Sequence, residues 1–242
     1  MEEIKTQAIV LKSNNYKDSG RMLTIFSLDK GLMYAKINGV KKPKAKLAFA
    51  SQPFCFGEFI IVSKYGNTVI NCSSIENFYE LTKNFDNFIA GEGVLEIVSI
   101  LARPEEANPE LFLNTLKALK LLNYTKAQPL AVLIKFLLVA LKNAGYSINV
   151  NECVVCGNKS PQKVNFSFEL GGVVCSICAK EDSIKLEKGE FGILKTIANT
   201  EFEKIEGLKF SSIENLTSVL KVLVKFFFDK TGETLNGITE YL

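Results

Sequence analysis

The chain has 242 residues, of which 47% are hydrophobic and 23% are charged. A chain of this size buries roughly 70–75% of the surface of its unfolded state, which excludes a mainly disordered protein. It contains no histidine, which excludes Ser-His-Asp and Cys-His catalysis, histidine-containing zinc hydrolases and the histidine-containing nucleobase deaminases. Any chemistry of this protein therefore proceeds without an imidazole.

The sequence contains neither a recognisable signal peptide nor an apolar run long enough to span a membrane. The first residues are acidic and are followed by alternating apolar residues, which is unlike a signal peptide. The longest nearly apolar run, residues 130–141, contains Lys135 and is shorter than the ~18–20 residues of a membrane span. We therefore predict a cytoplasmic protein with no membrane partner.

The net charge is only +3, but the basic surplus lies near the N-terminus. Residues 1–80 contain eleven Lys and Arg against seven Asp and Glu, whereas residues 81–152 contain seven of each and residues 153–242 eleven against twelve. No acidic residue lies between Lys30 and Gly57. The lysines of this segment, which follow one another closely, are Lys30, Lys36, Lys41, Lys42, Lys44 and Lys46. Their density favours a polyanionic partner, and the alternative is a solvated loop whose lysines only aid solubility.

Residues 1–80 have the pattern of a small β-structure. Short apolar or alternating runs at residues 6–12, 22–28, 32–37, 54–62 and 68–75 are separated by turn-forming clusters such as Asn14-Asn15 and Asp29-Lys30-Gly31. Five short strands suit a small Greek-key barrel, of which the OB-fold is the five-stranded example. Because side chains fill the interior of such a barrel, we expect function on its outer face and loops, where Arg21 and the lysines would fall.

Helical spacing begins near residue 85. Apolar residues between 130 and 141 recur at steps of three and four, and their neighbours are also apolar, which predicts a helix buried on all sides. Residues 85–102 and 109–123 also have helical composition. Residues 213–227 predict a last helix that packs on this bundle, with residues 226–228 either buried or forming an apolar patch for a partner.

Four of the six cysteines have the spacing Cys-x2-Cys-x18-Cys-x2-Cys, namely Cys153, Cys156, Cys175 and Cys178. The two-residue spacing lets both thiolates of a pair face one tetrahedral ion, and the residues between the pairs suffice for a short hairpin. Four thiolates leave no open position, which predicts one structural zinc ion. A redox dithiol pair, an iron–sulfur cluster and plain buried cysteines are the alternatives. Cys55 and Cys72 are most simply small buried hydrophobes.

The sequence thus predicts an α+β multidomain protein. We expect an OB-fold barrel over residues 1–80, an all-α domain divided between residues 81–150 and 183–242, and an inserted four-cysteine zinc module over residues 151–182. No nucleotide cofactor is predicted, because the Gly232–Gly237 stretch has Ile238 at the position of the phosphate-loop lysine. Gly91 and Gly93 lack the third glycine of a dinucleotide turn.

Several motifs occur in a distinctive order. They are Gly20-Arg21-Met22-Leu23-Thr24-Ile25-Phe26 with Gly31, Gly39-Val40-Lys41-Lys42-Pro43-Lys44, Gln52-Pro53-Phe54, Cys153-Val-Val-Cys156-Gly157, Phe166-Ser167, and Gly171-Gly172-Val173-Val174-Cys175 followed by Cys178. Together they resemble the RecO family of bacterial recombination mediators. The resemblance covers residues 1–180, and the cysteine module with its double glycine is its most specific part.

The resemblance implies an OB-fold, a helical domain and a zinc-binding insertion in a non-enzymatic protein that binds single- and double-stranded DNA. RecO-like proteins anneal complementary strands and, with RecR, help to load RecA onto DNA covered by single-strand-binding protein, whose C-terminal tail is a further expected partner. Such a protein is cytoplasmic and joins the nucleoid when bound to DNA. On this chain the resemblance assigns zinc ligation to the four clustered cysteines and DNA contacts to Arg21, Lys36, Lys41, Lys42, Lys44 and Lys46.

Two other functions stay open from the sequence. The first is a zinc-ribbon module that binds protein and does not bind DNA significantly, and the second is a metalloenzyme with an open zinc partly coordinated by Asp or Glu. Tyr16, Tyr34 and Phe49 lie near the cations in the sequence and are suited to stack bases if DNA binds there. The alternative is that these aromatic side chains fill the barrel. For Phe49 we expect a side chain that packs in the interior of the barrel.

Overall fold

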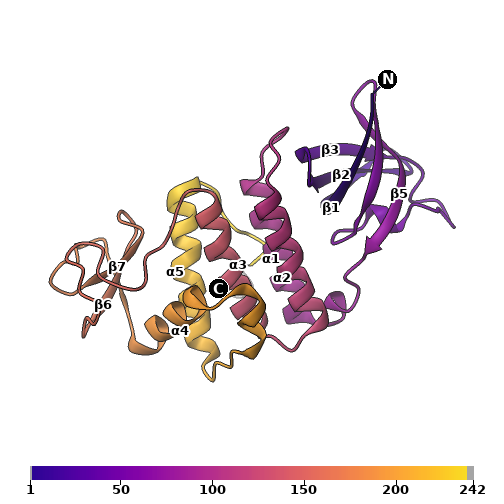
Figure 1. The fold of residues 1–242 in the computed structure, drawn as a ribbon. Coiled ribbons are helices and arrows are strands. Elements are labelled where there is room, and N and C mark those ends of the chain that lie inside the picture. The colour runs from indigo at the N-terminus through magenta and orange to yellow at the C-terminus, as the bar shows by residue number, and fades with distance from the viewer. Residues whose placement is uncertain (1, 239–242) are drawn as a thin grey trace.

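A β-barrel, a helical bundle and a small sheet follow one another along the long axis of the molecule (Figure 1). The structure is a computed structural model that describes residues 2–238. The barrel lies at one end, the bundle in the middle and the small sheet at the other end (Figure 1). Because the polypeptide leaves the bundle to build the small sheet and then returns, the bundle is assembled from two separate stretches of chain.

The barrel is closed by five strands: β1 (Glu2–Tyr16), β2 (Gly20–Ser27), β3 (Gly31–Ile37), β4 (Phe56–Ser63) and β5 (Asn67–Glu76). Their order around the barrel is β1-β2-β3-β5-β4, with β3 and β5 parallel and the other pairs antiparallel. This closed five-stranded barrel confirms the predicted OB-type domain.

β1 is longer than the predicted strand of residues 6–12. Asn14 and Asn15, which the sequence places in a turn, pair with Met22 and Arg21 in β2 after an irregularity between Val10 and Lys12. The turn lies after Tyr16, where Lys17 has a φ of 50°. An irregularity of this kind bends a strand, and it lets one long β1 pair with β4 through its first half and with β2 through its second half.

Side chains of the barrel alternate between two hydrophobic environments. Inward residues such as Val10, Leu23 and Phe59 form the barrel interior. Ile9 and Phe26 point the other way and join the core of the helical bundle, where the Phe26 ring lies 5.5 Å from the ring of Phe112. The barrel and the bundle are therefore joined by a continuous apolar contact.

The bundle consists of α1 (Phe85–Leu101), α2 (Pro109–Tyr124), α3 (Pro129–Asn143), α4 (Lys188–Asn199) and α5 (Ile213–Thr231). The predicted helices over residues 85–102, 109–123, 130–141 and 213–227 are confirmed with small changes at their ends. The side chains of Asn84, Asn108 and Ser212 accept backbone N–H bonds at three helix N-termini. None of the helices over residues 2–238 is long and apolar enough to cross a bilayer.

α3 lies at the centre of the bundle and is buried on most of its circumference, as its apolar sequence predicts. Its one buried charge, Lys135, donates from Nζ to the carbonyl oxygens of Ile197 (3.3 Å) and Ala198 (3.1 Å) at the end of α4. Burial lowers the pKa of Lys135, and nearby Lys142 lowers it further. Lys135 thereby connects the chain before the small sheet with the chain after it.

Gly91 and Gly93, which lack the third glycine of a dinucleotide-binding turn, lie in α1 where other parts of the chain pack closely against the helix. A Cβ at Gly93 would lie 2.3 Å from Ile238 and 3.1 Å from Leu133, and one at Gly91 would lie 2.9 Å from Phe54. The glycines therefore let the barrel, α3 and the segment after α5 approach α1 closely.

The small sheet has the order β7-β6-β8, with β6 (Val164–Ser167), β7 (Gly172–Cys175) and β8 (Ile184–Leu186). β6 and β7 form the hairpin expected between the two cysteine pairs, and β8 lies beyond residue 182. Of the three terminal phenylalanines of α5, Phe226 and Phe227 are buried and Phe228 is half exposed.

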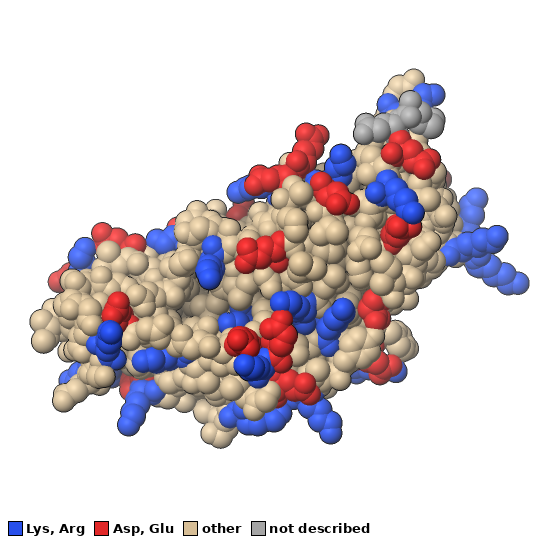
Figure 2. Space-filling model, viewed as in Figure 1, with Lys and Arg blue, Asp and Glu red and all other residues tan. Residues whose placement is uncertain are grey.

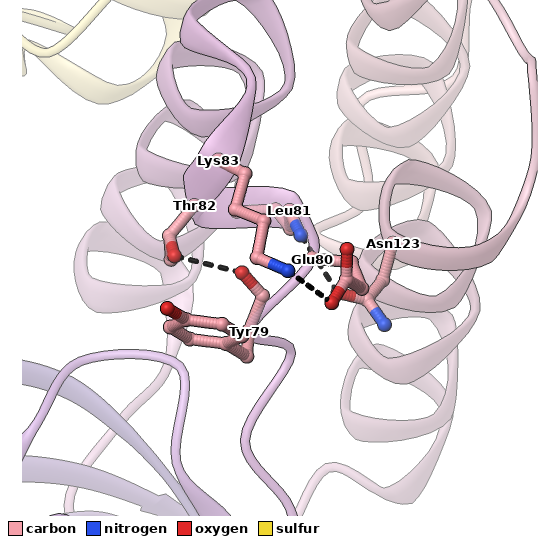
Figure 3. Close-up of polar contacts among 6 residues, drawn as sticks. All are labelled: Tyr79, Glu80, Leu81, Thr82, Lys83 and Asn123. Carbon is pink, nitrogen blue, oxygen red and sulfur yellow. Dashed lines mark hydrogen bonds and ion pairs between the residues drawn. The ribbon is translucent and has the colours of Figure 1, made fainter.

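Residues 2–238 also contain three short 3-10 helices: η1 (Phe49–Ser51), η2 (Leu81–Lys83) and η3 (Phe202–Gly207). η2 joins the barrel to α1, and its Leu81 N–H donates to Asn123 Oδ1 on α2 at 2.8 Å (Figure 3). Lys83 forms an ion pair of 2.6 Å with Glu80, and Thr82 Oγ1 donates to the carbonyl of Tyr79 at 2.8 Å (Figure 3). The connection between barrel and bundle is thus fixed to α2.

Candidate functional site

Four of the predicted DNA-contact residues lie in the segment between β3 and η1, residues 38–48, which we call the lysine loop. Lys41, Lys42, Lys44 and Lys46 are all exposed. Successive backbone turns run from Lys42 to Gly39, from Ala45 to Lys42 and from Ala48 to Ala45. Apolar side chains hold the loop at both ends, since Val40 is buried in the barrel core and Leu47 packs against it. The loop is therefore an ordered platform with its cations directed to solvent.

These cations have no acidic partner within the described part of the chain. Among residues 2–238, none of the four exposed lysines forms an ion pair, whereas Lys5, in the neighbouring β1, pairs with Glu58 at 3.0 Å. In the space-filling view, blue side chains project together from the right-hand edge of the barrel (Figure 2). A group of unpaired cations of this kind attracts a polyanion, since each cation is already free to contact a phosphate.

Lys36 and Arg21 lie at the same end of the barrel as the lysine loop. In the β2–β3 pairing Lys36 is opposite Met22, and Arg21 is opposite Ile37, the last residue before the loop. The backbone N–H of Lys41 donates to the carbonyl of Ser19 at 3.1 Å, which ties the loop to the β1–β2 turn. Strand pairing therefore gathers all six predicted DNA-contact residues at one end of the barrel.

Arg21 differs from the others in orientation. Arg21 shares its strand face with Leu23, which is fully buried inside the barrel, and its Nη1 lies 3.3 Å from Ser13 Oγ. The expectation from sequence places Arg21 on the outer face, but the register places it at the mouth of the barrel. The alternation of strand side chains explains the difference, because Arg21 is separated by two positions from an inward residue.

Exposed aromatic residues accompany the cations on the barrel surface. The Tyr34 side chain is 56% exposed on the strand face that carries Lys36, and Tyr65 in the β4–β5 turn is 86% exposed. Lys17 lies 5.4 Å from the ring centroid of Tyr16. Phe49 packs against the barrel core, in line with the expectation that it fills the barrel. Sequence reasoning did not single out Tyr65, although its position in the Lys64-Tyr65-Gly66-Asn67 turn is visible there.

The second candidate site is formed by the four clustered cysteines. One sulfur atom from each of Cys153, Cys156, Cys175 and Cys178 lies within 4.8 Å of all the others. The Sγ atoms of Cys156 and Cys175 are 3.9 Å apart, close to the roughly 3.8 Å separation that Zn–S bonds of about 2.3 Å give around a tetrahedral ion. The hairpin of β6 and β7 brings the second pair back to the first. The donor set and spacing suit a soft tetrahedral metal ion.

Backbone groups favour negative charge in this cluster. Burial opposes ionisation of Cys153, but N–H groups of Cys156, Cys175 and Val155 together lower the pKa of Cys153 to about 6. The N–H of Cys178 leads the groups that lower the pKa of Cys175. Cys55 and Cys72 lie buried in the barrel and outside this cluster.

Comparison with known proteins agrees with both parts of the structure. The family model described as "Recombination protein O N terminal" matches residues 1–78, and the one described as "Recombination protein O C terminal" matches residues 83–234. The boundary between the two matches falls at η2, where the barrel meets the bundle.

Proteins named DNA repair protein RecO are similar over nearly the whole chain. The protein from Clostridium novyi is 28% identical over 242 residues, covering 98% of this chain and 94% of the relative. The protein from Caldicellulosiruptor saccharolyticus is 30% identical over 228 residues, covering 93% and 91%. The protein from Acetivibrio thermocellus is 28% identical over 243 residues, covering 98% and 97%. Because the two family models match the barrel and the bundle, and because these relatives are similar over nearly the whole chain, this chain belongs to the RecO family of DNA repair proteins.

Proposed function

We propose that this chain is a non-enzymatic recombination mediator that binds single- and double-stranded DNA and anneals complementary strands. With RecR it assists the loading of RecA onto single-stranded DNA coated by single-strand-binding protein. The observation that supports this most strongly is the lysine loop on an OB-type barrel in a RecO-family chain. Its four exposed lysines form no ion pair with any residue from 2 to 238.

The physics of annealing fits such a surface. Two DNA strands repel each other through their phosphates, and lysines that neutralise phosphates on both strands reduce that repulsion and release counterions. Lysine contacts phosphate as a point charge and does not select a base sequence, so the surface suits any pair of complementary strands. Base pairing itself supplies the free energy, and no nucleotide hydrolysis is needed.

We further propose that Cys153, Cys156, Cys175 and Cys178 hold one structural zinc ion. The ion would bind four thiolates and would stabilise the β6–β7 hairpin and the cysteine turns. Because the four sulfur atoms would occupy all four coordination positions of a tetrahedral ion, the metal would have no open position for catalysis.

The proposed partners other than DNA are RecR and the C-terminal tail of single-strand-binding protein. A second candidate function is a zinc-ribbon module that binds protein without significant DNA binding. One observation favours it: Val155 and Ile177, which lie between the cysteines of each pair, are 56% and 94% exposed. Exposed aliphatic side chains on two adjacent turns are suited to a protein contact.

The experiment that tests the proposal is annealing of two complementary oligonucleotides coated with single-strand-binding protein, without ATP and at two salt concentrations. We expect the wild-type chain to accelerate annealing more at the lower salt concentration. The variant with Lys41, Lys42, Lys44 and Lys46 all changed to Ala should lose most of the acceleration while keeping the wild-type melting temperature.

A control variant changes four exposed lysines without ion pairs elsewhere on the described part of the molecule: Lys159, Lys163, Lys188 and Lys221. It loses the same net charge and should anneal as the wild type does. If both quadruple variants anneal equally well, the lysine loop is not the DNA surface. If the zinc-loaded wild-type chain gives no acceleration, the protein-binding module becomes the better explanation.

A further inference from the structure

A cavity with a volume of about 590 Å³ opens where the barrel meets the bundle. Its walls come from three parts of the chain: the segment from η1 to β4, the connection around η2, and α1. The volume falls within the roughly 300–1,000 Å³ of small-ligand pockets, and the junction between two domains is a common place for such pockets.

The walls of the cavity are largely aromatic. Phe54 and Phe88 form an edge-to-face pair with ring centroids 6.0 Å apart, and Phe49 also lines the cavity. Tyr79 stands at the opening with its side chain 66% exposed, and Lys83 Nζ lies 4.7 Å from the centroid of its ring. Because most of the Tyr79 side chain is exposed, its ring offers a stacking surface beside the cavity.

Polar groups accompany the aromatic rings. Gln52 and Asn77, which line the cavity, each carry an amide that can donate to and accept from a planar heterocycle. Glu92 lines the cavity as well. Burial raises the pKa of Glu92, and nearby Glu96 raises it further against the opposing effect of Lys12.

The cavity lies beside the lysine loop. Lys46 precedes Phe49 by three residues, so their Cα atoms are at most about 11 Å apart, and the backbone bond from Ala48 to Ala45 shortens that path. A strand whose phosphates contact the end of the loop therefore has its bases within reach of the cavity. Charge beside an aromatic pocket is the arrangement used to bind single strands, in which cations follow the backbone and rings stack on bases.

We propose that this cavity receives an unpaired nucleobase of a single DNA strand whose phosphates lie on the lysine loop. The inference rests on the proposed DNA binding and adds to it a site that distinguishes single-stranded from double-stranded DNA. In a duplex the bases are paired and stacked, and a base enters the cavity only after it leaves the stack. The protein therefore binds the single strand through bases and phosphates, and the duplex through phosphates alone.

The test compares two oligonucleotides of equal length, one with normal bases and one with abasic sugars throughout. The variant Tyr79→Leu removes the stacking surface, and Tyr79→Phe keeps the ring. We expect Tyr79→Leu to weaken binding of the normal strand at least about five-fold, the lower end of one base–aromatic stack, and to leave binding of the abasic strand unchanged. Tyr79→Phe should bind both strands as the wild type does.

A control variant, Phe228→Leu, removes an exposed aromatic ring from α5, which lies outside the cavity lining, and should bind both strands normally. Equal affinities of Tyr79→Leu and wild type for the normal strand would overturn the inference. An apolar peptide would then be the better candidate ligand for the cavity. In that case, binding of the abasic strand still reports on the lysine loop, so the proposed function stands or falls separately. A wild-type chain that binds neither strand overturns both proposals.

Discussion

The ring of Phe166 in β6 lies 5.5 Å from the ring of Phe226 in α5, edge to face at 86°. Phe168 completes the group, with its ring 5.4 Å from that of Phe166 and 6.4 Å from that of Phe226. Both Phe166 and Phe226 are almost completely buried. The cysteine module is therefore held against α5 by packing of aromatic side chains.

This contact predicts that Phe226→Ala is strongly destabilising. Removing a buried phenylalanine leaves a cavity and costs about 3–5 kcal/mol of unfolding free energy. Phe228→Ala on the same helix removes a half-exposed ring and should change stability by no more than about 0.5 kcal/mol. Urea unfolding followed by circular dichroism measures both. Equal losses for the two variants would show that the aromatic group does not anchor the module.

A second prediction concerns the contact between the barrel and the loop after α1. Gly31 has a φ of +66°, and a Cβ there would lie 2.2 Å from the carbonyl oxygen of Glu106 and 2.4 Å from that of Arg103. The next residue, Leu32, donates its N–H to the Arg103 carbonyl at 2.9 Å. Gly31→Ala should therefore cost about 2–4 kcal/mol, from backbone strain and from separation of the two segments.

Gly66→Ala is the matched control for Gly31→Ala. Gly66 also has a positive φ, of +86°, but a Cβ there would meet nothing within 4 Å. This variant should cost only the conformational strain, about 1–2 kcal/mol. Thermal unfolding of both variants separates strain from steric conflict, and a Gly31→Ala protein as stable as Gly66→Ala would contradict the close approach.

A third prediction concerns the salt dependence of DNA binding. Each lysine that neutralises a phosphate contributes about 0.7 to the slope of log K against log salt for a single strand. The quadruple alanine variant of the lysine loop should therefore have a slope smaller by up to about 3. Fluorescence anisotropy over a salt titration measures it. An unchanged slope would mean that the phosphates are bound elsewhere.

A fourth prediction concerns the metal. Cys178→Ser should lower the zinc content from about one ion per chain to near zero, because three thiolates hold zinc less well than four. The melting temperature should fall as well, since the ion contributes folding free energy. Cys72→Ala, which changes a buried cysteine outside the cluster, should keep its zinc. Zinc content that falls equally in the two variants would argue against the four-sulfur site.

A fifth prediction follows from the raised pKa of Glu92. A carboxyl group with a higher pKa in the folded than in the unfolded state contributes stability below its unfolded pKa, about 4.3, and loses it as the pH rises through the folded value. Glu92→Gln removes that loss. The variant should be more stable than wild type near pH 7.5 and similar to it near pH 4, as measured by urea unfolding. A constant difference at both pH values would contradict this assignment.

Much of the fold follows from the sequence because local patterns determine it. The alternation of residues 22–28 and 32–37 predicts β2 and β3, and the spacing within residues 130–141 predicts α3 and its burial. The cysteine spacing predicts which four sulfur atoms meet, because a Cys-x2-Cys turn confines each pair and a hairpin joins them.

Features that depend on contacts between residues far apart in the sequence cannot be predicted from local patterns. The local pattern ends β1 too early, because Asn14 and Asn15 favour turns locally, whereas pairing with β2 holds them in the strand. The inward register of Arg21 depends on the same pairing. The aromatic cavity forms because Phe54 and Phe88 come together from different domains. No local sequence pattern around either residue predicts that contact.

The two-sided pairing of β1 also has a consequence for synthesis. Glu2–Ile9 pairs with residues 56–63 of β4, so at about 5–20 residues per second the first strand waits several seconds for its partner to be made. Until then β1 and β3 are open edges on which two nascent chains can pair. The lysine loop is translated within this interval, and lysines beside an open edge oppose edge-to-edge association. We expect the lysines that we propose as DNA contacts in the finished barrel to keep unfinished barrels apart on a polysome as well.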